Sequence, residues 1–171
     1  MNPFINRLLG SIAAVRYHGA RGGPWHSLMR KIARLRYMFW SIVTQSDIDP
    51  RAMLGSGLKL PHPNGVVIHE DAVIGNDCMI MQQVTIGMIG DGEVPKLGDN
   101  IYVGAGAKII GRVVIGDGAR IGANAVVVRD VPAGATAVGI PAAIVADRRD
   151  GRSKPPRTRR SSQAGTTTKR R

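Results

Sequence analysis

One histidine stands out by its type and its surroundings. His62 lies between two prolines in the stretch LKLPHPNGVVIHEDAVIG, residues 58–75, whose other members are mostly aliphatic residues and glycine. An imidazole titrates near neutral pH, so it can take a proton from a hydroxyl when a nearby carboxylate orients the ring. Asp47 lies fifteen residues earlier and Glu70 eight residues later. These spacings make His62 a candidate general base.

The residues alone leave two other roles open for His62. A lone histidine often serves as a hydrogen-bonding filler in a fold. A metal site needs further ligands at suitable spacing, and the other three histidines show none relative to His62, so we predict no metal. Cys78 is the single cysteine, which excludes a disulfide framework. We expect it to be a small core residue, because it falls at a position that other repeats fill with Val or Ala.

A repeat of six residues runs through the middle of the chain and must position these side chains. Its aliphatic members are Ile48, Leu54, Ile68, Ile74, Ile80, Ile86, Leu97, Val103, Ile109, Ile115, Ile121 and Val127. A period of six fits neither a simple strand nor an α-helix. It is typical of a chain that makes a short strand and a turn in every repeat and closes into a prism. We predict a mainly β fold, a parallel β-helix of hexapeptide repeats over residues 46–145.

Two segments interrupt this repeat. Eleven residues separate Ile86 from Leu97, and the turn-rich segment MIGDGEVPK predicts a loop extruded from one coil. The other interruption is LPHPNG, which contains His62. Regular coils are occupied with packing, so we expect function at such departures. If one coil takes about three hexapeptides, Asp47 lies on the neighbouring coil beneath His62, and Glu70 lines the same cleft.

Residues 24–45 predict a helix. Apolar residues at positions 25, 28, 29, 32, 35, 39, 42 and 43 share one face, basic residues occupy the other, and Pro24 stands near the start. A solenoid needs its open end covered, so we expect residues 1–45 to form a helical cap. The alternative is that this basic amphipathic helix rests on a membrane.

The net charge of +12 is concentrated at the two ends of the chain. Residues 1–45 carry seven Arg or Lys and no acidic residue, whereas residues 146–171 carry ten against two acidic ones. The second segment is rich in Pro, Ser, Thr and Gly, so we predict a disordered basic tail there. We expect no specific nucleic-acid partner, only weak contact of the basic ends with anionic surfaces. Without an apolar run of membrane-spanning length or a convincing secretory signal, the predicted location is cytoplasmic.

The stretches SDIDPRAMLGSGLKLPHPNGVVIHEDAVIGNDCMIMQQVTIG and PKLGDNIYVGAGAKIIGRVVIGDGARIGANAVVVRDVPAGATAVGIPAAIV resemble the serine O-acetyltransferases of the left-handed β-helix superfamily. The resemblance is carried by Asp47 with His62, by Glu70, by GAGAK at 104–108 and by VGIPA at 138–142. It implies a homotrimer with acetyl-CoA in a cleft between neighbouring prisms. It also implies that His62, oriented by Asp47, deprotonates the serine hydroxyl, and that Glu70 contributes to the acceptor site.

The resemblance also suggests where acetyl-CoA binds. Glycine-rich coil faces would let a pantetheine arm lie close to the backbone and bond with its amides. Two basic side chains would meet the phosphates, although solvated surface charge is the alternative for both. The candidate residues are Gly87, Gly104, Ala105, Gly122, Lys108 and Arg120.

The chain departs from the family pattern at several positions. Pro61 stands where the family has Asp before the histidine, and Glu93-Val94 stand where it has Arg-His. In the family those residues help to hold the amino-acid acceptor. The N-terminal segment is shorter than the family's helical domain, and the chain ends in Lys169-Arg170-Arg171 rather than an Ile-terminated tail. We therefore expect no assembly of trimers through that domain and no docking to the partner sulfhydrylase.

The predicted function is transfer of acetyl from acetyl-CoA to a small-molecule hydroxyl, that of L-serine, as in cysteine biosynthesis. Two alternatives remain open. One is O-acetylation of a sugar hydroxyl in polysaccharide synthesis, since short relatives with PHP and VIH look like acetyltransferases found with that process. The other is a non-catalytic β-helix scaffold.

Overall fold

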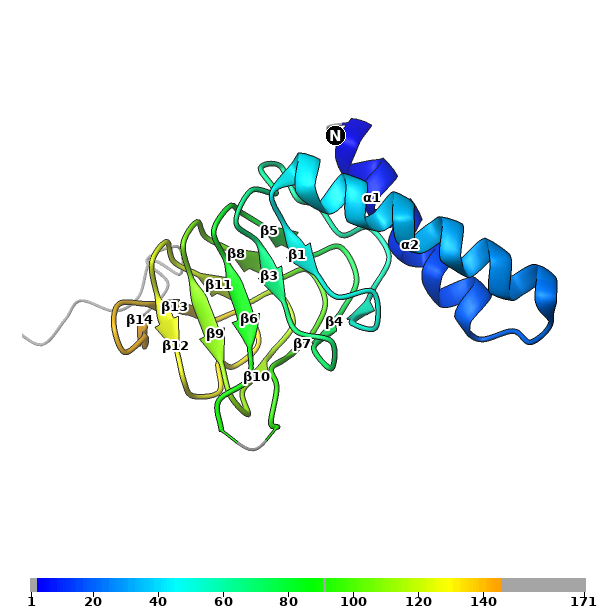
Figure 1. Cartoon of the computed structure of the whole chain (residues 1–171). Helices are drawn as coiled ribbons and strands as arrows, with labels where there is room; N and C mark the ends of the chain where they lie inside the picture. Colours follow the sequence, from blue (N-terminus) through cyan, green and yellow to red (C-terminus); the bar gives the residue numbers. More distant parts are fainter. Residues whose placement is uncertain (1–2, 91, 146–171) are drawn as a thin grey trace, which may run out of the picture.

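The chain folds into a three-sided prism of stacked coils with a helical hairpin at one end (Figure 1). The computed structural model describes residues 3–90 and 92–145; the basic tail predicted for residues 146–171 lies outside them. Successive coils contribute short strands to three sheets, named here faces A, B and C. The pairing within faces A and B is parallel, and face C is parallel up to its last strand. The predicted parallel β-helix is confirmed.

The strands are two or three residues long, as a six-residue repeat with one turn per repeat requires. Face A contains β1 (Asp47–Ile48), β3 (Val67–Ile68), β6 (Thr85–Gly87), β9 (Lys108–Ile110) and β12 (Val126–Val127). Face B contains β2 (Met53–Leu54), β4 (Val73–Ile74), β7 (Lys96–Leu97) and β10 (Val114–Ile115). Face C contains β5 (Met79–Ile80), β8 (Tyr102–Val103), β11 (Arg120–Ile121), β13 (Thr136–Val138) and β14 (Ala143–Val145).

The strand register gives the length of each coil. Strand β9 pairs with β12 eighteen residues later, so a regular coil takes three hexapeptides. Strand β1 pairs with β3 twenty residues later, and β6 pairs with β9 twenty-three residues later. The two longer coils are those interrupted by LPHPNG and by the segment after β6. Both interruptions are therefore accommodated outside the strands, and the predicted extruded loop is confirmed.

The prism interior is filled by the aliphatic positions of the repeat. Eleven of the twelve predicted residues are at most 3% exposed, and Leu54 in the first coil is half-buried. Cys78 is fully buried, which confirms it as a core residue, and this burial raises the pKa of its thiol. Each coil thus repeats the same burial pattern, and the stacked coils form one continuous core.

Two helices, not one, precede the prism: α1 (Pro3–Gly19) and α2 (Pro24–Thr44). The α2 helix was predicted, but its apolar face does not cover the first coil. The buried residues of α1, including Ile5, Leu8 and Ile12, join the prism core instead. From α2, only Tyr37 and Trp40 near its end pack against this core, both partly buried. The cap is therefore built mainly by the start of α1.

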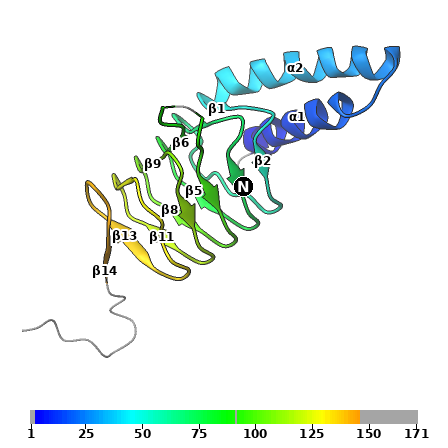
Figure 2. The same ribbon diagram turned by 90° about the horizontal axis from the view of Figure 1, so that it is seen from below.

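Beyond this contact the hairpin leaves the prism. Figures 1 and 2 show both helices projecting from the N-terminal end of the β-helix, with the turn between them at the far tip. The Arg16 guanidinium donates to the Ala52 carbonyl at 3.3 Å and so ties α1 to the first coil. Neither helix of the described chain is long and apolar enough to cross a membrane.

Candidate active site

His62 lies on a turn at the corner between faces C and A, called here the C–A corner. The turn is fixed on both sides: Lys59 bridges to Met79 in face C, and the Gly65 amide donates to the Gln45 carbonyl at 2.6 Å. Gly65 has φ +69°, a conformation that favours glycine. The flanking prolines further restrict the backbone. The sequence LPHPNG therefore builds a rigid projection that carries one imidazole.

The His62 side chain is exposed in a shallow hollow lined by Phe4 of α1, by the end of α2 and by the turn itself. Within residues 3–90 and 92–145, no side chain or backbone group hydrogen-bonds the ring. A structural histidine normally has its ring nitrogens satisfied. The position therefore disfavours the filler role and leaves both nitrogens open to a ligand.

Asp47 is positioned by the junction between α2 and β1. Helix α2 ends at Thr44 and is capped by Gln45, whose left-handed conformation (φ 53°) lets the Ser46 amide donate back to the Ser41 carbonyl at 3.1 Å. Ser46 is buried, and its hydroxyl bonds with that of Thr44 at 2.8 Å. The Asp47 amide then donates to the Val66 carbonyl at 2.8 Å. This polar junction fixes the carboxylate at the start of face A, where it is exposed.

The register places Asp47 and His62 at the same corner but not directly over one another. Because their coil has twenty residues instead of eighteen, Asp47 lies opposite Val67. His62 belongs to the turn that precedes Val67. In the described chain no hydrogen bond joins the Asp47 carboxylate to the His62 ring. Direct pairing of the two side chains stays a prediction.

Tyr37 is a neighbour of Asp47 that sequence reasoning missed. Burial raises the pKa of its hydroxyl, and the negative charge of Asp47 raises that pKa further, whereas a hydrogen bond with Ser41 lowers it. The hydroxyl therefore keeps its proton at neutral pH, beside the carboxylate. No spacing in the sequence indicates this electrostatic interaction, because it links the end of α2 to the first strand.

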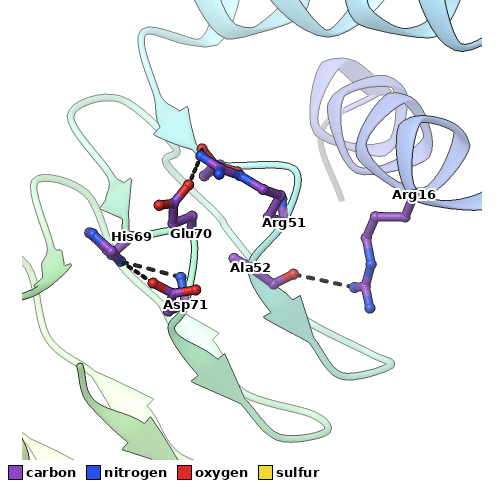
Figure 3. A network of polar contacts seen from close by, with 7 residues as sticks. Arg16, Arg51, Ala52, His69, Glu70 and Asp71 are labelled. Atoms are coloured by element: carbon purple, nitrogen blue, oxygen red, sulfur yellow. Dashed lines mark hydrogen bonds and ion pairs between the residues drawn. The ribbon is translucent and has the colours of Figure 1, made fainter. Parts of the chain in front are cut away.

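Glu70 lies at the opposite edge of face A, after β3. Its carboxylate pairs with Arg51 of the preceding coil, whose guanidinium also contacts Asp49 at 3.2 Å (Figure 3). Strand β3 lies between the turn that carries His62 and Glu70, so the two residues sit at opposite edges of face A. The structure therefore does not bring Glu70 to His62 within one chain, and its predicted acceptor role is not tested. Arg51 was not singled out from the sequence.

The same edge of face A offers the described chain's one group of metal-ligand types, His69, Glu70 and Asp71, with ligand atoms within 4.8 Å of one another. Several of their atoms already have contacts within the chain. Arg51 pairs with Glu70, and the Asp71 amide donates to Nδ1 of His69 at 3.2 Å. The arrangement is therefore accounted for by contacts among the residues themselves.

The candidate glycines differ in what their missing Cβ atoms allow. A Cβ at Gly104 would lie 2.6 Å from the Ala123 amide nitrogen, and one at Gly122 would lie 2.7 Å from Val138 Cγ1. Coil stacking alone thus explains these two glycines. At Gly87 a Cβ would meet just Thr85 Cγ2, at an ordinary 3.6 Å. Packing does not require glycine there, so Gly87 stays a candidate for close approach of a ligand.

The backbone near these glycines offers a donor. Ala105 lies at the C–A corner, where its carbonyl accepts from the Asn124 amide at 2.8 Å. Its own amide donates to no group in the described residues. An unused amide on an outer corner is the kind of donor that the predicted pantetheine contact needs.

The two basic candidates lie on different faces. Lys108 starts β9 on face A, and its ammonium donates to the Gln83 carbonyl at 2.8 Å and to the Thr85 hydroxyl at 3.0 Å. Arg120 starts β11 on face C, with its guanidinium 4.7 Å from the centre of the Tyr102 ring. The structure does not bring these two cations together within one chain.

The extruded loop after β6 lies between faces A and B, near the Glu70 edge. A bridge between Ile89 and Glu93 closes it. Arg112 of the next coil contacts the Glu93 carboxylate at 3.3 Å. The loop therefore presents an acidic residue that a neighbouring guanidinium already neutralises.

Comparisons with known proteins cover most of the chain. The family model "Bacterial transferase hexapeptide (six repeats)" matches residues 95–129. The curated serine acetyltransferase of Mycobacterium tuberculosis is 42% identical over 137 residues, 78% of this chain and 60% of that protein. The corresponding Escherichia coli protein is 43% identical, and 45% of its length is covered. The chain thus spans about half the length of the curated relatives it matches.

Among solved structures, a serine acetyltransferase in complex with cysteine aligns with a TM-score of 0.64 at 35% identity, over 84% of this chain and 70% of that chain. The chain belongs to the serine acetyltransferase family. Soybean serine acetyltransferase complexed with serine aligns with a TM-score of 0.66 at 40% identity, over 79% of this chain and 56% of that one. A serine acetyltransferase complex with CoA aligns with a TM-score of 0.65 at 38% identity, over 79% of this chain and 55% of that one.

Proposed function

We propose that this protein is an O-acetyltransferase that transfers acetyl from acetyl-CoA to the hydroxyl of L-serine, giving O-acetylserine and CoA. The observation that carries the proposal is the exposed, unpartnered His62 ring on a rigid turn, beside the strand that begins with Asp47. The family relationship supports the same activity, because solved relatives are complexes with serine and with CoA.

In the proposed reaction, His62 accepts the proton of the serine hydroxyl while that oxygen attacks the thioester carbonyl carbon. The carbon–sulfur bond then breaks, and the CoA thiolate takes up the proton from the imidazolium. A positioned general base contributes about 10²–10⁴-fold to such a rate. The remainder comes from holding hydroxyl and thioester together. Asp47 orients the imidazole and stabilises its charged form.

Acetyl-CoA enters this scheme as a substrate. Gly87 on face A and the free Ala105 amide at the C–A corner give the pantetheine arm an approach to the backbone. Lys108 and Arg120 lie on different faces, so phosphate contacts from both require walls of two prisms. A homotrimer supplies such walls, because each cleft in a closed ring is formed by two different surfaces of neighbouring copies. In this scheme Glu70 faces the acceptor, and residues 46–145 form the catalytic domain.

The test is release of the CoA thiol from acetyl-CoA in the presence of a panel of acceptors. L-serine should give turnover that depends on acceptor concentration and stoichiometric O-acetylserine, identified by mass spectrometry. Sugars with free hydroxyls form the second arm of the panel. Turnover with a sugar and none with L-serine would reassign the acceptor while keeping the chemistry. Thiol release with neither, by a protein that is folded by circular dichroism, would reject acetyl transfer to these acceptors.

A further inference from the structure

Helix α2 presents an unusual surface to solvent. Six large apolar residues alternate at spacings of three and four, so they form one stripe along the helix. All six are between 43% and 76% exposed. This α2 stripe consists of Trp25, Leu28, Ile32, Leu35, Phe39 and Ile42.

The rest of the described chain does not cover the stripe. The two buried residues of α2, Ala33 and Thr44, lie on its other side, and the start of α1 closes the prism. Figures 1 and 2 show the hairpin projecting away from the coils. Contiguous exposed apolar patches of this kind mark interaction sites.

Charge distinguishes between the partners that such a stripe could have. Lys31, Arg34 and Arg36 are exposed on α2, and residues 1–45 contain no acidic side chain. If two stripes paired as a parallel coiled coil, Lys31 would fall at a g position and face Arg36 at the partner's e position. These like charges would repel, and the segment has no carboxylate to relieve them.

An anionic lipid surface matches both features of the helix. We propose that the α2 stripe docks the protein onto membranes that contain anionic lipids, with the apolar residues at the headgroup–acyl boundary and the basic residues on lipid headgroups. Helices with an apolar face, basic flanks and no capacity to span the bilayer lie in this plane. Trp25 at one end suits the interface, where tryptophan is enriched. The proposal rests on the hairpin and does not depend on acetyl transfer.

The first experiment measures binding of the full chain to vesicles of equal parts phosphatidylglycerol and phosphatidylcholine. Leu35→Gln with Ile42→Gln removes apolar contact at sites 66% and 76% exposed, so the fold should persist. We expect about a tenfold or greater loss of the bound fraction in this double variant, measured at high salt where electrostatic attraction is screened. Met53→Gln with Ile144→Gln, at prism sites 56% and 50% exposed, is the matched control and should bind as wild type does.

The second experiment locates the helix relative to the lipid. The chain has two tryptophans, so a Trp40→Phe background leaves Trp25 as the single reporter. Its emission should shift to the blue with anionic vesicles, and brominated acyl chains should quench it. No shift, or equal loss of binding in the control variant, would overturn the proposal.

Two further outcomes would also overturn it. Binding that survives in the stripe variant and disappears with salt would assign the contact to basic segments alone. An assembly that the stripe variant breaks up without lipid, in a protein that does not bind vesicles, would show that the stripe pairs with a second copy.

Discussion

His62 is available for chemistry because of how its turn is anchored. The bridge at Lys59 and the hydrogen bond from Gly65 to Gln45 hold the backbone, so the imidazole needs no contact of its own. The turn positions the imidazole, and the imidazole remains free to react.

We predict that His62→Ala lowers kcat for acetyl transfer by at least about 10²-fold, the low end of general-base contributions. The turn is held by backbone groups, so CoA binding, measured by calorimetry, should persist. His18→Ala, in the helical hairpin, is the matched control and should keep wild-type kcat. Near-wild-type turnover of His62→Ala with a good acceptor would show that the base is another group.

The glycines give a paired prediction about packing and ligand approach. Gly104→Ala forces a methyl group to 2.6 Å from the Ala123 nitrogen, so stability should fall by about 1–3 kcal/mol, measured by chemical denaturation. Gly87→Ala meets no close atom in the coil and should leave stability within about 0.5 kcal/mol of wild type. If the pantetheine arm passes Gly87, this variant should raise the KM for acetyl-CoA. An unchanged KM would exclude that path.

Tyr37 gives a prediction about pH. Its folded-state pKa lies above the ordinary value of about 10 because the side chain is partly buried and feels the negative charge of Asp47. The unfolded chain therefore loses the hydroxyl proton at lower pH than the folded chain does. The contribution of Tyr37 to the free energy of unfolding is constant below about pH 10, and it falls as pH rises above the ordinary pKa. Tyr37→Phe should show a smaller decline in urea midpoint across this range than wild type. Parallel declines would mean that Tyr37 titrates alike in both states.

At the scale of elements, the β-helix was predictable because every coil buries the aliphatic residue at the same position of the six-residue repeat. The pattern repeats from Ile48 to Val127, so it identifies the fold even where the strand or helix preference of a short segment is ambiguous. The Asp47–His62 geometry was less predictable, because it depends on how many residues one interrupted coil takes. The regular repeats predicted eighteen residues for this coil, whereas the coil interrupted by LPHPNG has twenty.

The helical cap shows a different limit. A helical cap was predicted for residues 1–45, but the one helix located within it was 24–45, so the bounds of α1 were not predicted. In the structure the Ser11 hydroxyl donates to the Arg7 carbonyl at 2.7 Å, so the helix accommodates it without an unsatisfied group. Both helices carry apolar stripes, and sequence alone does not say which one meets the prism.

This assignment of the cap predicts unequal effects of two leucines. Leu8 on α1 is fully buried in the core, so Leu8→Ala should destabilise the protein by about 2–5 kcal/mol. Leu35 on α2 is 66% exposed, and Leu35→Ala should change stability by less than about 0.5 kcal/mol in lipid-free buffer. Denaturant titrations of both variants measure the difference. A large loss at Leu35 alone would return the capping role to α2.

At the scale of the whole molecule, the candidate residues are spread around one prism rather than gathered on it. His62 and Asp47 lie at the C–A corner, Glu70 at the far edge of face A, and Arg120 on face C. Within the described residues, the candidate side chains of a single copy therefore lie on parts of more than one wall. Threefold packing brings different surfaces of neighbouring copies together and repeats the same cleft three times.

We therefore predict that the active form is a trimer and that its activity depends on assembly. On dilution, specific activity should fall over the same concentration range in which light scattering shows the mass decreasing from three chains to one. Acetyl-CoA should shift this range to lower protein concentration, because a ligand held between two copies binds the assembled state more tightly than the separate chains. If the exposed imidazole serves chemistry rather than assembly, His62→Ala should dissociate over the wild-type range. A monomer with full specific activity would require that one prism face completes the site, and the scattered positions of Glu70 and Arg120 would then have no part in it.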